Sequence, residues 1–148
     1  MSSPADGIVA GARAESEVWA RALAGAPDWE AVFSPLVPEA LGLGLETVYE
    51  AYLVHYGKPR LFEASDEHDA VLLGDYLYAH GLVRVAEAGG VHAVAVLAGL
   101  ISRCAALRAD GDPGDGEAWV EAARALGGDP PDDAVAAALR KHASRSRR

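Results

Sequence analysis

Residues 66–108, DEHDAVLLGDYLYAHGLVRVAEAGGVHAVAVLAGLISRCAALR, decide the fold of this chain because they hold its longest helical periodicity. Apolar or small residues recur there at the i, i+3, i+4, i+7 spacing of one helix face. These residues are Val71, Leu72, Gly74, Tyr78, Ala79, Leu82, Val85 and Ala86. We expect Ser65 to cap a helix over 66–87. We expect Gly89 and Gly90 to turn the chain into a second helix over 91–108 that returns antiparallel to the first.

Asp75 lies within this apolar stripe. A carboxylate on a buried helix face is costly, or shifts its pKa, unless it is paired or hydrogen-bonded. Asp75 is therefore predicted to be either a structural hydrogen-bonding residue or part of a site.

The rest of the chain is also predicted to be helical. Helical periodicity predicts further helices over residues 3–24, 28–34, 43–56, 117–126 and 132–140. Alanine dominates the apolar residues, whereas β-branched and aromatic residues are few, which favours packed helices over a sheet. We therefore predict one all-α domain over residues 1–140, an antiparallel bundle of about six or seven helices, followed by a basic tail over residues 141–148.

Charge and cysteine content narrow the function classes. The net charge is −9, and five of the 13 Lys and Arg residues lie in the last nine positions, so the body is strongly acidic. An acidic body argues against a nucleic-acid interface. The single cysteine, Cys104, allows no intramolecular disulfide, is expected in the core, and fits a cytoplasmic protein. We expect no transmembrane segment, because no apolar run reaches about 20 residues.

Glu46 and Glu50 lie one turn apart on the predicted helix 43–56. Two carboxylates at this spacing can hold a divalent cation, but they repel each other when no cation is present. The same spacing is common on solvated helix faces, so both interpretations stay open. The five histidines (His55, His68, His80, His92 and His142) lack metal-ligand spacing and are expected to be surface or hydrogen-bonded residues.

Two stretches resemble trans-prenyl diphosphate synthases. DAVLLGDYLYAHGLVRVAE at 69–87, with Gly74 and Asp75, resembles the helix after that family's first aspartate-rich motif, where an Ala-Ile-Leu-x-Gly-Asp-x-Leu-Leu-like signature recurs. The stretch HYGKP at 55–59 resembles the family's Arg-Arg-Gly-x-Pro element. By register, the metal-binding Asp-Asp-x-x-Asp motif then falls on ETVYE at 46–50. The resemblance covers residues 43–108 and implies a truncated bundle of isoprenoid-synthase type.

The resemblance also implies that the site has degenerated. In the family, the aspartate motif holds Mg²⁺ ions that bridge the allylic diphosphate, and the two arginines grip the diphosphates. Here Glu46, Thr47 and Glu50 replace the three aspartates, His55 and Tyr56 replace the two arginines, Lys58 is the variable residue of the element, and no second aspartate-rich motif is present. The chain alone is therefore expected to lack a catalytic site and a bound metal, although Mg²⁺ is possible in a complex.

Some bacterial synthases of this family pair a catalytic large subunit with a small helical subunit that lacks the motifs and sets product chain length. The resemblance implies that this chain is such a non-catalytic or regulatory subunit, in which Gly74 and Asp75 are structural. Small residues of its two central helices would line a hydrocarbon tunnel; these are Ala79, Leu82 and Ala86, or Ala93, Val96 and Leu97. Two alternatives remain: a self-sufficient Mg²⁺-dependent prenyl transferase that acts as a homodimer, and a helical protein-interaction module without prenyl chemistry.

Overall fold

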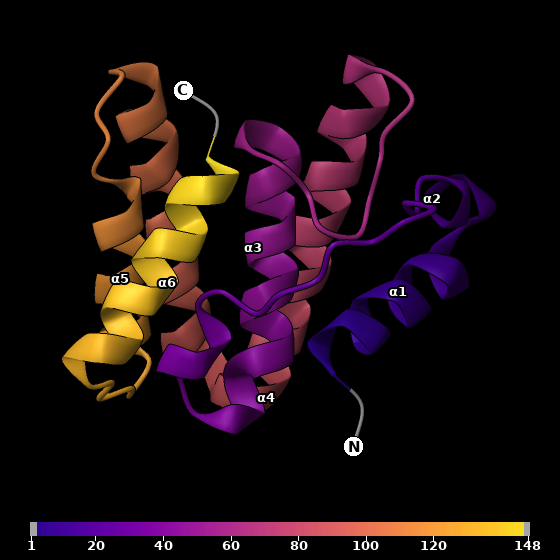
Figure 1. Cartoon of the computed structure of the whole chain (residues 1–148). Helices are drawn as coiled ribbons and strands as arrows, with labels where there is room; N and C mark the ends of the chain where they lie inside the picture. Colours follow the sequence, from indigo (N-terminus) through magenta and orange to yellow (C-terminus); the bar gives the residue numbers. More distant parts are fainter. Residues whose placement is uncertain (1–2, 147–148) are drawn as a thin grey trace.

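The computed structural model describes residues 3–146, which fold into an all-α arrangement (Figure 1). The helices are α1 (Pro4–Glu15), α2 (Glu17–Arg21), α3 (Gly42–Tyr56), α4 (Glu67–Ala109), α5 (Asp115–Ala125) and α6 (Asp132–Arg145), with short 3-10 turns η1 (Ser34–Leu36) and η2 (Glu39–Leu41). Within the described residues, β pairing is limited to two isolated bridges, Leu23 with Phe62 and Gly57 with Ser146. The predicted all-α class is confirmed.

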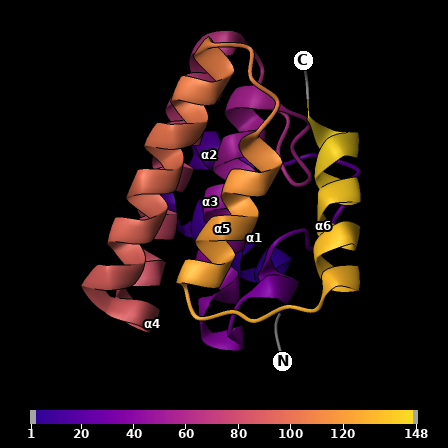
Figure 2. The same ribbon diagram turned by 90° about the vertical axis from the view of Figure 1, so that its left-hand side faces the viewer.

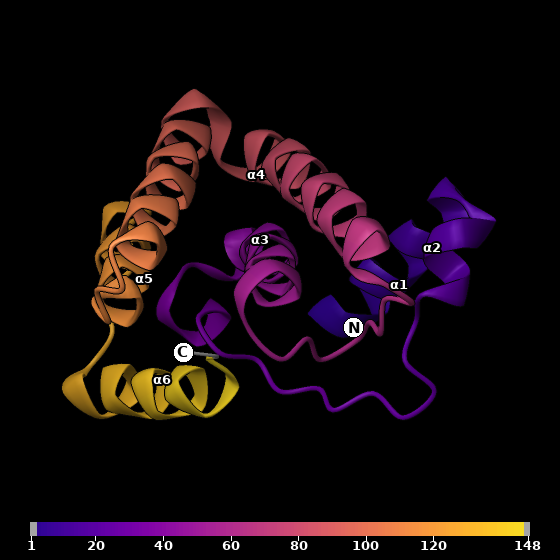
Figure 3. The ribbon, with the colours of Figure 1, turned by 90° about the horizontal axis from the view of Figure 1, so that it is seen from above.

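Helix α3 forms the centre of the molecule. Seen from above, it lies between the two halves of α4, with α5 and α6 on one side and α1 and α2 on the other (Figure 3). Every residue from Gly44 to Leu53 is buried. A helix that is covered on all sides cannot be amphipathic, and its polar residues must find partners inside the protein.

Helix α4 bends back on itself at Gly90, where φ is 73° and ψ is −166°. The first half of α4 runs down the molecule and the second half runs back up, as Figures 1 and 2 show. A positive φ of this kind strains any residue with a Cβ, so glycine suits the corner. The predicted turn between two helices is confirmed, but the halves diverge around α3 instead of packing along each other (Figure 3).

The first half of α4 crosses α3 closely at two glycines. A Cβ on Gly81 would lie 2.7 Å from Val48 Cγ2 and 3.0 Å from the Val48 backbone nitrogen. A Cβ on Gly44 would lie 3.0 Å from the backbone nitrogen of Val85. Because backbone atoms cannot yield as a flexible side chain can, the two glycines set the separation of the helices.

The buried face of the first half of α4 differs from the predicted stripe. The buried residues are Leu73, Gly74, Leu77, Gly81 and Val85, which follow a spacing of about four around the crossing with α3. Val71 and Leu72, expected inside, are about half exposed. Asp75 lies outside the buried face, so the prediction that its carboxylate is buried was wrong.

Two predicted N-terminal elements also differ. The helix expected over 3–24 is interrupted at Ser16, whose extended backbone (φ −166°) ends α1 and whose hydroxyl accepts a hydrogen bond from Trp19 N to start α2. No α-helix forms over 28–34, because N–H groups of that segment bond elsewhere. Val32 N and Ser34 N donate to the Glu46 carboxylate, and Asp28 N donates to a carbonyl of the 57–66 connection.

The predicted basic tail over 141–148 is helical and packed as far as α6 extends. Arg145 is buried, and its Nη2 donates to both the backbone oxygen and the carboxylate of Asp28. Its backbone oxygen accepts a hydrogen bond from Lys58 N at 2.9 Å. These contacts attach the end of α6 to the core. The boundary proposed at residue 141 stays a prediction. Residues 147–148 lie outside the described residues.

Helix α4 is long and apolar enough to cross a membrane by length and composition, and only 22% of its most apolar 18-residue stretch is buried. Such a helix is weak evidence of a span, because a core helix of a soluble protein can meet the same test. The expectation of no transmembrane segment stays a prediction. The exposed large apolar residues of α4 are Val71, Leu72, Val83 and Val91.

Candidate functional site

The outer acidic positions of the ETVYE stretch lie inside the protein. Glu46 and Glu50 have 0% relative exposure, and the side chain of Arg60, from the 57–66 connection, lies between them. Arg60 Nη1 contacts Glu46 Oε1 at 2.5 Å, and Arg60 Nε donates to Glu50 Oε1 at 2.9 Å. The pair is therefore not a solvated helix face, because a guanidinium neutralises part of its charge in the core.

Backbone groups satisfy the remaining carboxylate oxygens. Glu46 Oε2 accepts hydrogen bonds from Val32 N at 3.0 Å and Ser34 N at 2.8 Å. Glu50 Oε2 accepts from Arg60 N and Leu61 N, both at 2.9 Å. Each oxygen of the two carboxylates thus has a donor, which is the condition under which a buried charge is tolerated.

Arg60 is held in place by oxygen atoms and by aromatic rings. Its Nη1 also donates to the Glu30 carbonyl at 2.8 Å, and its Nη2 donates to the Glu46 carbonyl at 3.3 Å. The guanidinium carbon lies 4.2 Å from the centre of the Trp29 ring and 5.0 Å from that of Tyr49, within cation–π range. Burial alone lowers the pKa of Arg60, but attraction to Glu46 and Glu50 outweighs it and raises the pKa above its usual value.

Thr47, the middle position of the stretch, contacts a second arginine. Its hydroxyl donates to the Leu43 carbonyl at 2.7 Å and accepts from Arg84 Nη1 at 3.0 Å. Arg84 Nη2 also reaches the Gly7 carbonyl at 2.9 Å, which joins α1 to α3 and α4. All three positions that match the metal motif are therefore engaged by arginine side chains.

The two stretches that resemble the synthase family meet at His55 and Asp75. Asp75 Oδ1 lies 3.5 Å from His55 Nε2, and the Asp75 side chain is 67% exposed. A Cβ on Gly74 would overlap the His55 ring, so glycine allows the ring to lie against α4. Burial lowers the pKa of His55, and the nearby Asp75 carboxylate partly offsets that effect. The lowered pKa favours the neutral form of this imidazole at pH 7.

Of the other two matched positions, Tyr56 contacts His55, with its ring centre 5.9 Å from the centre of the His55 ring. The Tyr56 ring packs 5.0 Å from the Tyr52 ring, and Lys58 is exposed. The Arg108 guanidinium carbon lies 5.4 Å from the Tyr56 ring. His55 and Tyr56 are thus neighbours, whereas Lys58, the third position, is exposed.

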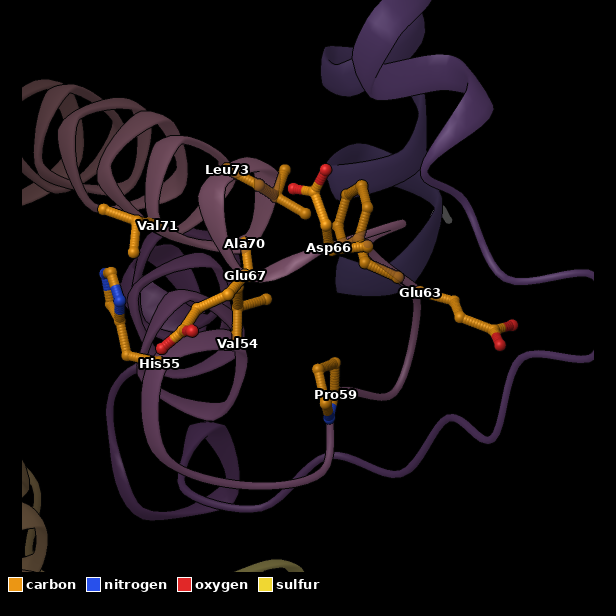
Figure 4. Close-up of a pocket in the computed structure, with 11 residues that line it drawn as sticks. Val54, His55, Pro59, Glu63, Asp66, Glu67, Ala70, Val71 and Leu73 are labelled. Carbon is orange, nitrogen blue, oxygen red and sulfur yellow. The ribbon is translucent and has the colours of Figure 1, made fainter.

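A pocket of about 490 Å³ opens beside His55, between the end of α3, the 57–66 connection and the start of α4 (Figure 4). Its lining is apolar at Val54, Phe62 and Leu73 and acidic at Glu63, Asp66 and Glu67. Figure 4 shows Glu67 directed toward His55, with Glu63 on the opposite side. None of the lining residues is Lys or Arg. The pocket therefore repels anions and offers a diphosphate no cationic donor.

A second buried polar network, which the periodicity did not predict, links α3 to α5 and α6. The carboxylate oxygen Asp115 Oδ2 accepts from Tyr52 OH at 2.6 Å and lies 2.9 Å from His142 Nε2. His142 Nδ1 lies 2.7 Å from Tyr49 OH. Desolvation by burial raises the pKa of both tyrosines above its usual value. Helical periodicity did not point to Asp115, which lies at the first position of α5.

The remaining candidates do not form a reactive site. Burial raises the pKa of the Cys104 thiol to about 12, so it is a protonated core residue at neutral pH. Among the described residues, no group of three or more His, Cys, Asp or Glu side chains could hold a metal ion. Of the predicted tunnel residues, Ala79 and Ala86 face solvent, whereas Ala93 and Leu97 pack in the core around α3.

Comparison with known proteins gives no assignment. The chain matches no protein-family model, and neither a curated protein nor a solved structure matches it.

Proposed function

We propose that this chain is a non-catalytic or regulatory small subunit of a cytoplasmic, heteromeric polyprenyl diphosphate synthase. In this proposal it pairs with a catalytic large subunit and adjusts the rate and product chain length. The supporting observation is the contact between the two stretches that resemble the family, in which His55 Nε2 lies 3.5 Å from Asp75 Oδ1. Gly74 makes this contact possible because a Cβ there would overlap the imidazole.

The chemistry of the site supports the non-catalytic part of the proposal. The carboxylates of Glu46 and Glu50 are saturated by Arg60 and by backbone N–H groups. Mg²⁺ needs near-octahedral oxygen ligands and usually keeps several waters, which two fully buried carboxylates cannot provide. The Mg²⁺ and the cationic groups that bind diphosphates would therefore come from the large subunit.

The outer surface of α4 supports pairing with another chain. Val91 is 86% exposed, and Val71, Leu72 and Val83 are each about half exposed. Exposed large apolar residues spread along one helix are candidates for a protein–protein contact. The large subunit would cover this side of α4.

The direct test mixes the purified chain with a candidate large subunit, isopentenyl diphosphate and an allylic primer. We expect a complex on gel filtration and a change in turnover and product length. Val91→Lys should weaken the complex, because it places a charge on the α4 surface. The matched control is Val18→Lys, since Val18 is also exposed but lies on α2. No complex, with rate and product length unchanged, would contradict the proposal.

A helical interaction module without prenyl chemistry is the second candidate. It is favoured by the position of α3, which fills the space between the two halves of α4 where a hydrocarbon tunnel would have to pass (Figure 3). The exposed apolar residues of α4 support this candidate as much as the first. A complex with the large subunit that leaves product length and rate unchanged would favour the module.

A further inference from the structure

The surroundings of the Arg60 guanidinium resemble those of a bound cation. Four oxygen atoms accept its hydrogen bonds: Glu46 Oε1, Glu50 Oε1, the Glu30 carbonyl and the Glu46 carbonyl. Two carboxylates and two backbone carbonyls form a hard-oxygen set of the kind that binds Ca²⁺ or Mn²⁺. The Glu46 and Glu50 oxygens come from α3, and the Glu30 carbonyl comes from the segment before η1.

The same oxygens leave no room for a metal ion while Arg60 is present. Trp29 and Tyr49 cover the guanidinium, and Glu46, Glu50 and Arg60 are each at most 1% exposed. The family resemblance places a metal at Glu46 and Glu50, but their oxygens already accept N–H groups. The residues of this chain therefore do not fit the metal that the resemblance implies.

We infer that Arg60 is the resident cation of this four-oxygen site: its guanidinium takes the place of a divalent cation, holds the 30–34 and 60–61 segments against α3, and excludes metal ions from the native chain. The inference concerns the isolated chain and does not depend on the proposed partner. It predicts that the site accepts an added cation only after the guanidinium has been removed.

The test compares thermal unfolding of the isolated wild-type chain and of Arg60→Ala, each in NaCl, in MnCl₂ at matched ionic strength, and in millimolar methylguanidinium. The wild-type Tm should be the same in MnCl₂ and NaCl. Arg60→Ala should lower Tm by roughly 6–20 °C, because two buried carboxylates lose their counter-charge. Methylguanidinium or Mn²⁺ should recover part of this loss by binding the folded state.

The matched control is Arg103→Ala, which removes an Arg–Glu pair of the same chemistry with Glu121 on the surface. It should change Tm little and gain nothing from either cation. If Arg60→Ala does not fold, refolding yield measured by circular dichroism, with and without methylguanidinium, replaces Tm. Arg60→Lys, which keeps the charge but loses the planar fork, should fold with a smaller loss of Tm.

Two results would overturn the inference. The first is stabilisation of the wild-type chain by Mn²⁺ beyond the NaCl control, abolished by Glu50→Gln, because the native site would then admit a metal. The second is an Arg60→Ala chain that neither cation stabilises or helps to refold, which would make Arg60 an ordinary ion-pair residue. Neither result bears on whether the chain binds a synthase subunit.

Discussion

The acidic residues of α3 and of the first half of α4 have opposite surroundings. Glu46 and Glu50 on α3 are fully buried, and every carboxylate oxygen is hydrogen-bonded. The Asp75 side chain on α4 is 67% exposed, with its Oδ1 3.5 Å from His55 Nε2. Sequence analysis predicted a buried Asp75 and left a solvated Glu pair open. The difference teaches that burial depends on where a helix lies among its neighbours, which its own periodicity does not determine.

The largest effect is expected at Glu46, one of the two fully buried acids of α3. Glu46→Ala should destabilise the fold by about 3–5 kcal/mol, because it leaves Arg60 partly unpaired and removes the acceptor of Val32 N and Ser34 N. Urea unfolding followed by tryptophan fluorescence measures the change. Glu121→Ala, at the exposed pair with Arg103, is the matched control and should have little effect. Equal losses in the two variants would contradict the assigned role of the Glu46 carboxylate.

A third buried acid, Asp115, extends the comparison to α5. Asp115→Asn should cost about 1.5–3 kcal/mol, because the amide is a weaker acceptor for Tyr52 OH and for His142. The same unfolding experiment measures it. His142→Asn, combined with Asp115→Asn, should be less damaging than the sum of the single changes because the two residues share one network. Strictly additive losses would show that the network is not coupled.

The helix crossing offers a test that involves no charge. Gly81→Ala should destabilise the protein by about 1–3 kcal/mol, because its Cβ would meet the backbone nitrogen of Val48. Gly99→Ala is the matched control on the same helix, since a Cβ at Gly99 meets no atom within 4 Å. It should stabilise the chain by up to about 1 kcal/mol through helix propensity. A tolerated Gly81→Ala would mean that α3 and α4 can separate without cost.

Asp75 is the exposed acid of the comparison and should contribute little to the stability of the fold. Asp75→Asn should change the free energy of unfolding by less than about 0.5 kcal/mol. It should also lower the pKa of His55 further, because the carboxylate opposes the effect of burial. An NMR titration of the His55 ring protons measures this shift. A loss of stability as large as that of Glu46→Ala would contradict the exposed position of Asp75.

The smallest expected effect is the pH dependence that His55 and His80 share. Burial lowers the pKa of both, so the unfolded chain binds more protons than the folded chain below about pH 6.5. Stability should therefore fall as pH drops through that value toward the folded-state pKa. Unfolding at about pH 7.5 and about pH 5.5 measures the slope. His55→Gln should reduce it, and an unchanged slope would contradict the lowered pKa.

Local signals were sufficient for most of the helices. Alanine content and helical spacing predicted the all-α class, the end of α3 at residue 56 and the corner of α4 at Gly90. They did not predict that 28–33 would remain non-helical and that Val32 N and Ser34 N would bond to Glu46 from α3. Glu46 lies 12–14 residues from these N–H groups in the sequence, far beyond the four-residue spacing of helical hydrogen bonds.

The sequence by itself determined most of the helices and the corner at Gly90. The resemblance of the HYGKP and Gly74-Asp75 stretches to a synthase stays a prediction. Only the tertiary structure decided which acids are buried. Arg60 follows Pro59 in a connection that composition assigned to a loop, yet its guanidinium lies between Glu46 and Glu50 in the core. The physical reason is that a buried charge is stable only where a partner of opposite charge meets it, and the packing of distant segments around α3 decides where that happens.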